Sequence, residues 1–200
     1  MVTAPGQVAR IALVNPGIPA VDGVIRYQLL PDQKVKIEEG RWPFYGGELI
    51  LEPTILDFDV EAKRELTFRM VGLDAEKFLG NYDIENLRVA GVFDGTLPMV
   101  FDQEGGRIVG GWLVSRPGGG ELSYLGEISY KDMGVMANFA FDALRSIRFE
   151  EMQIGVDGNL GGEVVTEVRF RGLQQGSLAK RNYITRQLAK LPIEFNVRIA

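Results

Sequence analysis

The chain has 200 residues, a net charge of −5, and neither histidine nor cysteine. Without these two residues it cannot form a Ser-His-Asp triad, a cysteine nucleophile or a zinc site built on histidine and cysteine. The acidic balance argues against nucleic-acid binding, which usually needs a basic face. No apolar run approaches the length of about 18 residues that a membrane-spanning helix needs. We therefore expect no enzyme, no cofactor, no metal site and no nucleic-acid partner.

Apolar and polar residues alternate with a period of two along most of the chain, which is the pattern of strands with one buried and one wet face. Such strands are typical of antiparallel sheets. The sequence therefore predicts a single, mainly β domain over residues 1–200. In chain order, the alternating stretches are residues 25–29, 34–38, 48–52, 65–70, 96–102, 152–157, 167–171 and 193–199.

Glycine is abundant, at 25 residues, and it recurs in short clusters between the alternating stretches. Such clusters favour tight hairpin turns. The Asp157-Gly158 pair is interpreted in the same way, as a type I′ turn rather than the start of a calcium loop. The sequence predicts turns at residues 46–47, 94–95, 105–106, 118–120, 157–158 and 161–162.

About three short helices are expected, over residues 74–82, 138–147 and 177–191. Asp74 suits the N-cap of the first helix. The third helix is basic in an otherwise acidic protein, and its cations could lie against anionic lipid headgroups or simply face water. These candidate headgroup-binding or membrane-surface residues are Lys180, Arg181, Arg186 and Lys190.

The apolar face of so many strands is too broad for three short helices to cover. Leaving it exposed would cost about 25 cal/mol for each Å². The sheet could curl on itself, pack on a second sheet, bind a partner or bind an apolar ligand such as an acyl chain. The alternation is the same for a filled sandwich or barrel core and for a greasy groove. Core packing is the expected role of both Trp42 and Trp112.

Three consecutive stretches resemble the C-terminal signature of the YdbH family, namely residues 91–99 (GVFDGTLPM), 105–114 (GGRIVGGWLV) and 116–124 (RPGGGELSY). This family belongs to the AsmA-like bacterial envelope proteins, which are related to TamB, and its C-terminal region has also been labelled a dicarboxylate transport domain. A dicarboxylate site needs convergent arginines, whereas the alternation supplies an apolar lining. The likeness extends to residues 15–18, 42–47, 138–144 and 180–182.

The resemblance implies a long curled antiparallel sheet, similar to a β-taco, whose apolar inner face carries phospholipid acyl chains through the periplasm toward the outer membrane. It also implies an inner-membrane anchor, an N-terminal helix that this chain lacks, so we expect an excised C-terminal segment of a longer protein. The candidate lipid-groove residues, chosen from the alternation, are Leu49, Leu51, Phe68, Met70, Leu97, Met99, Phe101, Leu122, Tyr124, Ile154, Val168, Phe170, Phe195 and Val197.

Other functions remain open at this stage. The exposed edge of the last strand could pair with an outer-membrane or periplasmic protein. A β-sandwich binding module, for example for carbohydrate, would display aromatic platforms in loops, whereas most aromatic residues here lie in alternating register. A purely structural scaffold would share the same pattern without carrying lipid.

Overall fold

The computed structural model describes residues 2–15, 18–59, 61–81, 87–124, 146–175 and 194–199, with only the backbone described for residues 124, 175 and 194–199. These residues form one sheet of 13 strands, all paired in antiparallel fashion. The first strands are β1 (Gln7–Val14), β2 (Ala20–Leu29), β3 (Lys34–Phe44), β4 (Gly47–Leu51), β5 (Thr54–Asp57) and β6 (Arg64–Asp74). The others are β7 (Leu87–Asp102), β8 (Gly105–Tyr124), β9 (Ile147–Phe149), β10 (Glu151–Asn159), β11 (Val164–Arg171), β12 (Gln174–Gln175) and β13 (Glu194–Ile199).

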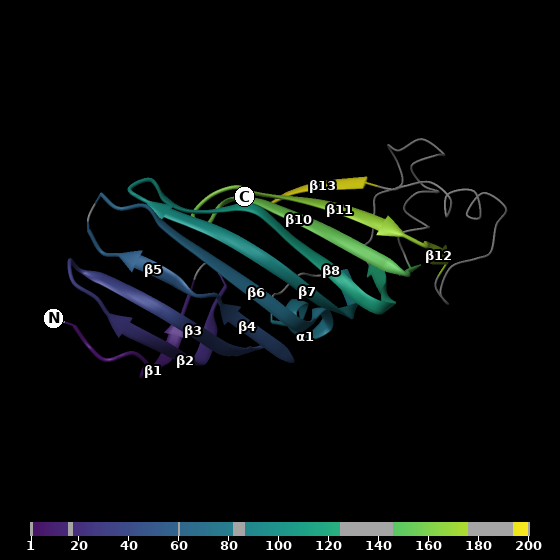
Figure 1. Ribbon diagram of the computed structural model, residues 1–200. Helices are drawn as coiled ribbons and strands as arrows, with labels where there is room; N and C mark the ends of the chain where they lie inside the picture. Colours follow the sequence, from purple (N-terminus) through teal and green to yellow (C-terminus); the bar gives the residue numbers. More distant parts are fainter. Residues whose placement is uncertain are drawn as a thin grey trace.

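The strands follow one another across the sheet in nearly the order of the sequence. The main path runs β1-β2-β3-β4-β6-β7-β8-β10-β11-β13, while β5 pairs with β3 and β9 joins β8 to β12. Within the described strands, β1 and β13 do not pair with each other, so the sheet stays open. Figure 1 shows that it is long and curved, with β1–β5 in one limb and β7–β13 in the other. The expected mainly β, antiparallel fold is confirmed.

The alternation in the sequence sets the two faces of the sheet. In β6, Phe68 and Met70 are buried while Arg69 between them is exposed. In β4, Leu49 and Leu51 are buried while Glu48 is exposed. Because successive side chains of a strand point to opposite faces, one face is mainly apolar and the other carries most of the charged residues. The second face also holds some apolar residues, such as Ile50, which is buried between Leu49 and Leu51. We call the two faces the inner face, which carries the hydrophobic cluster, and the outer face.

The glycine-rich clusters have two different roles. Residues 46–47 and 161–162 do lie at hairpin turns, and the β7–β8 hairpin ends beside residues 105–106. The turns predicted at 94–95, 118–120 and 157–158 are wrong, because these residues lie inside β7, β8 and β10. At Gly95 a Cβ atom would stand 2.4 Å from the carbonyl oxygen of Trp112, so the glycine serves close strand pairing rather than a turn.

The pairing register shifts at several places near the middle of the sheet. The shifts lie between Met70 and Leu73 in β6, and between Gly91 and Phe93 and between Thr96 and Met99 in β7. An extra residue in one strand bends it and increases its twist. These irregularities therefore account for part of the curvature that gives the inner face its concave side.

The described residues contain one short helix where about three helices were expected. This helix, α1 (Ala75–Leu79), begins at the predicted N-cap, because the Asp74 carboxylate accepts hydrogen bonds from the backbone of Glu76 and Lys77. The helix expected at 177–191 lies outside the described residues. The one expected at 138–147 also does, except for its last two positions, and Ile147 begins strand β9.

Candidate functional site

A row of apolar residues crosses the inner face from β3 to the last strand. Residues directly opposite each other in an antiparallel pair lie on the same face, so the pairing register defines the row. All of its members are apolar residues or glycine. In order across the sheet, they are Trp42, Leu49, Met70, Gly95, Leu113, Ile154, Val168 and Phe195.

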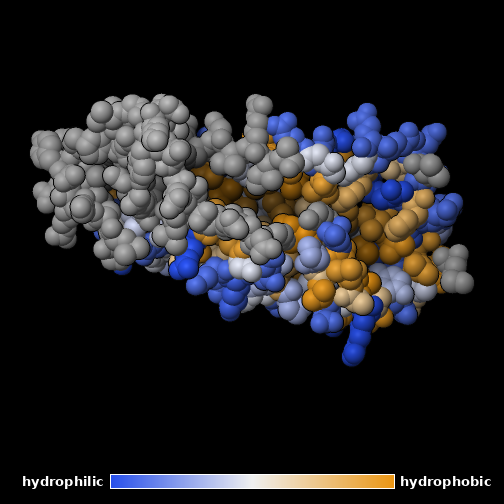
Figure 2. All heavy atoms as spheres, turned by 180° about the vertical axis from the view of Figure 1, so that it is seen from behind, coloured by the Kyte–Doolittle hydropathy of each residue, from blue (hydrophilic) through white to orange (hydrophobic). Residues whose placement is uncertain are grey.

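A second row runs beside the first over the N-terminal part of the sheet. Its register joins Ala9, Ile25, Gly40, Leu51, Phe68 and Leu97. Most members of both rows belong to one hydrophobic cluster or pack against it. Figure 2 shows hydrophobic side chains gathered between two hydrophilic rims, wherever grey atoms leave this side visible. The inner face therefore carries a continuous apolar band that follows the sheet, and most members of the band between β3 and β8 are buried in the structure.

The structure brings the sequence-predicted lipid-groove residues together on this face. Those whose side chains are described all belong to the hydrophobic cluster or pack against it: Leu49, Leu51, Phe68, Met70, Leu97, Met99, Phe101, Leu122, Ile154, Val168 and Phe170. For Tyr124, Phe195 and Val197 the backbone register alone is described, and it pairs Phe195 with Val168. The basic residues at 180, 181, 186 and 190 lie outside the described residues.

Several large buried members of the hydrophobic cluster were not among the candidates, including Phe93, Phe149 and Trp42. Trp42 is the largest of them and the least exposed. Its ring lies over Gly23 and Gly40, because a Cβ atom at Gly23 would be 1.9 Å from Trp42 Nε1 and one at Gly40 would be 2.8 Å from the far edge of the ring. Phe68 packs beside it, with ring centroids 6.2 Å apart. The sequence carried only part of this signal: Gly40 lies two positions before Trp42 and so on the same face of β3, whereas Gly23 comes from β2 and is brought under the ring by strand pairing.

The indole N–H of Trp42 is buried and has no hydrogen-bond partner within the residues that the structure describes. Only 1% of the residue is exposed. An unpaired donor in an apolar surface costs about 1–3 kcal/mol relative to a paired one. The position of Trp42 on the inner face is therefore stabilised by burial of its apolar ring and not by a hydrogen bond of its N–H group.

Ser115 is a buried polar residue beside the hydrophobic cluster, and its hydroxyl group has a hydrogen-bond partner. Ser115, in β8, is buried, and its hydroxyl oxygen accepts a 2.9 Å hydrogen bond from the backbone N–H of Met152. The bond ties β8 to the start of β10. Burying a hydroxyl without such a partner would be unfavourable.

The outer face carries ion pairs instead of apolar rows. Arg41 lies 2.8 Å from Glu39 and 3.1 Å from Glu48, and Arg171 lies 2.7 Å from Glu151. Trp112 is also on this face, directly opposite Thr96 and Gly155, and it is 48% exposed. The expected core position is thus right for Trp42 and wrong for Trp112, because alternation around a glycine-rich strand does not say which face each aromatic takes.

Asp94, Arg116 and Gly72 form a hydrogen-bonded group on the outer face, which we call the outer-face clamp, at the register shift in β6. The Asp94 carboxylate accepts two hydrogen bonds from Arg116, at 2.8 and 2.9 Å, and one from the Gly72 backbone N–H at 2.8 Å. Gly72 has a φ angle of 73°, a backbone conformation that residues with a side chain rarely adopt. The hydrogen bond from Arg116 holds the pKa of Asp94 below its usual range, partial burial opposes this, and the Gly72 bond adds to it.

Fold and face together define a class of protein: an open, curved, single-sheet β domain with one continuous apolar face and one charged face. The model of the YdbH-like family, described as intermembrane phospholipid transport protein YdbH, matches residues 1–200. The chain therefore belongs to the YdbH-like family of intermembrane phospholipid transport proteins. The resemblance found in the sequence motifs is confirmed.

Comparisons with curated proteins and with solved structures gave no match. Within the described residues, no helix is both long enough and apolar enough to cross a membrane. The same residues contain no group of three or more potential metal-binding side chains. The Asp57 carboxylate accepts a hydrogen bond from the Asp59 backbone N–H and lies 3.4 Å from the Lys34 ammonium group.

Proposed function

We propose that this chain conducts phospholipid acyl chains along the inner face of its open sheet, as a segment of a periplasmic protein that moves phospholipid between the inner and outer membranes. The observation that carries the proposal is the pair of unbroken apolar rows, one of which runs from β3 to β13. Family membership supports it, because the family model is that of an intermembrane phospholipid transport protein.

The physical basis is the match between a lipid tail and these rows. Leu, Met, Phe and Val offer apolar area without polar atoms that a hydrocarbon chain would leave unpaired. Each Å² of apolar surface that lipid and protein hide from water contributes about 25 cal/mol. The tail needs no covalent chemistry to move, because successive positions along the face offer similar contacts. The charged outer face stays in water.

A protein partner at the sheet edge remains part of the proposal. β1 and β13 end the path of the described sheet, so each has one side without a strand neighbour in that path. An open edge presents backbone N–H and C=O groups that can pair with a further strand. A longer protein or an outer-membrane partner could extend the apolar face in this way.

The purely structural scaffold is the main competing function. The hypothesis of a β-sandwich binding module is disfavoured because the described strands form one continuous sheet. A scaffold would have the same sheet, but its inner face would meet only protein side chains. The presence of lipid on that face therefore separates the two.

Site-specific photo-crosslinking tests this directly. A benzophenone amino acid at Leu97, on the inner face, should crosslink to phospholipid in cells, and mass spectrometry of the purified protein should detect the adduct. The control is the adjacent residue Thr96, which lies on the outer face opposite Arg69 and Trp112. Equal lipid adducts at both positions, or none at Leu97, would refute the proposed function.

A further inference from the structure

Within the described part of the chain, the ladder of strands is interrupted beside α1, at a place that we call the opening. β6 ends at Asp74, which pairs with Val92, so residues 87–91 of β7 extend beyond it. On the other side this stretch pairs with β8, from Leu87–Tyr124 to Gly91–Gly120. Among the described elements, α1 takes the place that a neighbouring strand would have. A helix cannot continue the hydrogen-bonded ladder of strands. Within the described ranges, the edge of β7 is therefore free of a paired strand here, and a ligand could contact both faces of the sheet around this edge.

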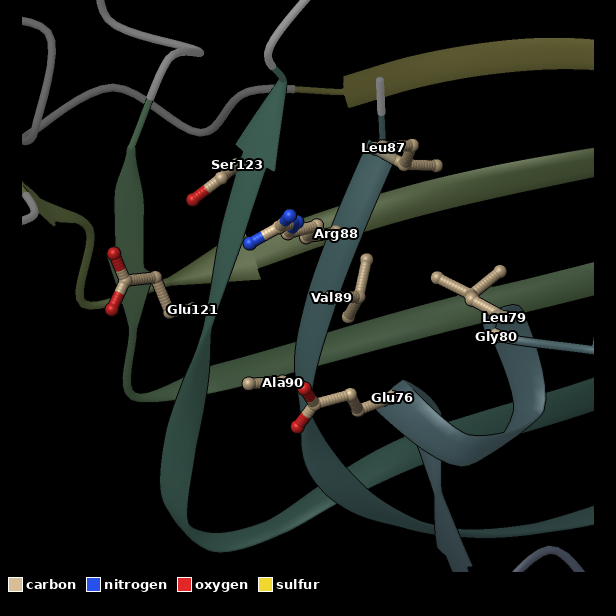
Figure 3. Close-up of a pocket in the computed structure, with 9 residues that line it drawn as sticks. All are labelled: Glu76, Leu79, Gly80, Leu87, Arg88, Val89, Ala90, Glu121 and Ser123. Carbon is tan, nitrogen blue, oxygen red and sulfur yellow. The ribbon is translucent and has the colours of Figure 1, made fainter. Parts of the chain in front are cut away.

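A pocket of about 530 Å³ lies at this opening. Figure 3 shows Arg88, Glu121 and Ser123 pointing to one side of β7 and β8, while Leu87 and Val89 point to the other, toward α1. The volume is within the range of about 300–1,000 Å³ that is typical of small-molecule sites.

The cation of this pocket is Arg88, and it has no ion-pair partner among the described residues. Arg88 and Ser123 are directly opposite each other in the β7–β8 pair. Within the described residues neither side chain has an ion-pair or hydrogen-bond partner, whereas Arg116 binds Asp94 and Arg148 lies 3.6 Å from Glu121. A guanidinium beside a hydroxyl offers several donors to one phosphate group.

The two carboxylates of the pocket differ. Glu121 accepts a 2.6 Å hydrogen bond from the buried Ser146 hydroxyl and lies near Arg148. Glu76, on α1, is exposed, and its carboxylate has no partner within the described residues. Glu76 is therefore free to attract a cation at the mouth of the pocket, and it would repel a second negative charge.

The apolar side of the pocket is continuous with the inner face. Val89 is a buried member of the hydrophobic cluster, and Leu79 and Leu87 pack against that cluster. α1 is held in place by Phe78, whose ring lies 5.2 Å from that of Tyr45 and 6.4 Å from that of Phe44. Polarity thus changes from charged to apolar across a single opening.

We propose that this opening binds the headgroup of a phospholipid whose tails lie on the inner face, and that it prefers a headgroup bearing an ammonium group. Arg88 and Ser123 bind the phosphodiester, Glu76 attracts the ammonium, and Leu79, Leu87 and Val89 contact the start of the tails. This inference rests on the proposed lipid-carrying function and adds a headgroup preference to it. A free phosphate ion shares part of this chemistry.

The test measures which lipid the protein takes from vesicles. Purified protein is incubated with vesicles of equal parts phosphatidylethanolamine and phosphatidylglycerol, re-isolated, and its lipid quantified by mass spectrometry. The wild type should be enriched in phosphatidylethanolamine. Arg88→Gln should lower total bound lipid about tenfold, since a charge-assisted bond is lost. Glu76→Gln should lower the phosphatidylethanolamine preference about threefold with less effect on the total.

Matched controls separate the site from general charge effects. Arg10→Gln removes an exposed arginine of the edge strand β1 and should change neither quantity. Ser123→Ala should weaken lipid binding less than Arg88→Gln. Inorganic phosphate, added in hundredfold excess over lipid, should leave the bound lipid unchanged if the site recognises the whole headgroup.

The outcomes distinguish this inference from the function on which it rests. If Arg88→Gln and Glu76→Gln bind lipid like the wild type while crosslinking at Leu97 persists, the headgroup site is wrong and the transport proposal stands. If inorganic phosphate removes the lipid from the wild type, the pocket is a phosphate site and the inference is also wrong. If the wild type takes no lipid and Leu97 gives no adduct, both proposals fail.

Discussion

The two faces of the sheet treat the same kind of residue in opposite ways, as the two tryptophans show. Trp42 lies flat over two glycines of the inner face and is 1% exposed, whereas Trp112 stands on the outer face and is 48% exposed. Each belongs to a strand with period-2 alternation. The comparison teaches that alternation assigns residues to faces only when the register is known. If the account is right, substitutions on the inner face should be costly and matched ones on the outer face should be mild.

The largest expected effect is the loss of an inner-face aromatic. Phe68→Ala should lower the free energy of unfolding by about 3–5 kcal/mol, because it leaves a cavity beside Trp42. Urea unfolding followed by circular dichroism measures the change. Trp112→Ala removes a larger but half-exposed ring and should cost less than about 1 kcal/mol. Similar losses for the two variants would break the distinction between the faces.

The next effect comes from the space that Trp42 fills. Gly23→Ala should cost about 1–3 kcal/mol, because the new methyl group would overlap the indole ring and force it to move. The matched outer-face change is Gly155→Ala, where the nearest atom is 3.8 Å from the added Cβ, and its effect should stay within about 0.5 kcal/mol. Thermal unfolding of both variants checks this. A harmless Gly23→Ala would show that the ring does not lie where the structure has it.

A smaller loss is expected from the paired hydroxyl in the core. Ser115→Ala leaves the Met152 N–H without the hydroxyl that accepts its bond and should cost about 1–2 kcal/mol. Ser123→Ala, on the outer face of the same strand, removes a hydroxyl that has no partner within the described residues and should be neutral. Urea midpoints of the two variants give the comparison. Equal midpoints would mean that the Ser115 bond does not stabilise the sheet.

The smallest effect is expected from the outer-face clamp. Asp94→Asn should lower the melting temperature by about 1–2 °C at neutral pH, as for an exposed ion pair. Because the folded pKa of Asp94 is lowered, its contribution is present above the unfolded value of about 3.9 and is lost as the pH falls through the folded pKa. The two melting temperatures should therefore converge below about pH 4. A difference that grows on acidification would contradict this assignment.

Much of the fold could be predicted from local sequence patterns. The predictions that were wrong concern features that depend on contacts between residues far apart in the sequence. Phe68 and Met70, or Leu49 and Leu51, reach the inner face because alternation with charged neighbours leaves one consistent register. The Asp74 cap was visible because capping involves adjacent residues. Gly95 was misread as a turn because its need for a missing Cβ comes from Trp112 on another strand. The pocket at Arg88 could not be foreseen, since it depends on where β6 ends relative to β7.

The central claim is that acyl chains lie on the inner face and not on the outer one, and the two tryptophans can report it directly. Trp112→Phe leaves Trp42 as the one tryptophan, and Trp42→Phe leaves Trp112. Phospholipid with brominated tails quenches tryptophan at short range. We predict strong quenching of Trp42 fluorescence and little quenching of Trp112. Equal quenching of both, or quenching of Trp112 alone, would contradict the account.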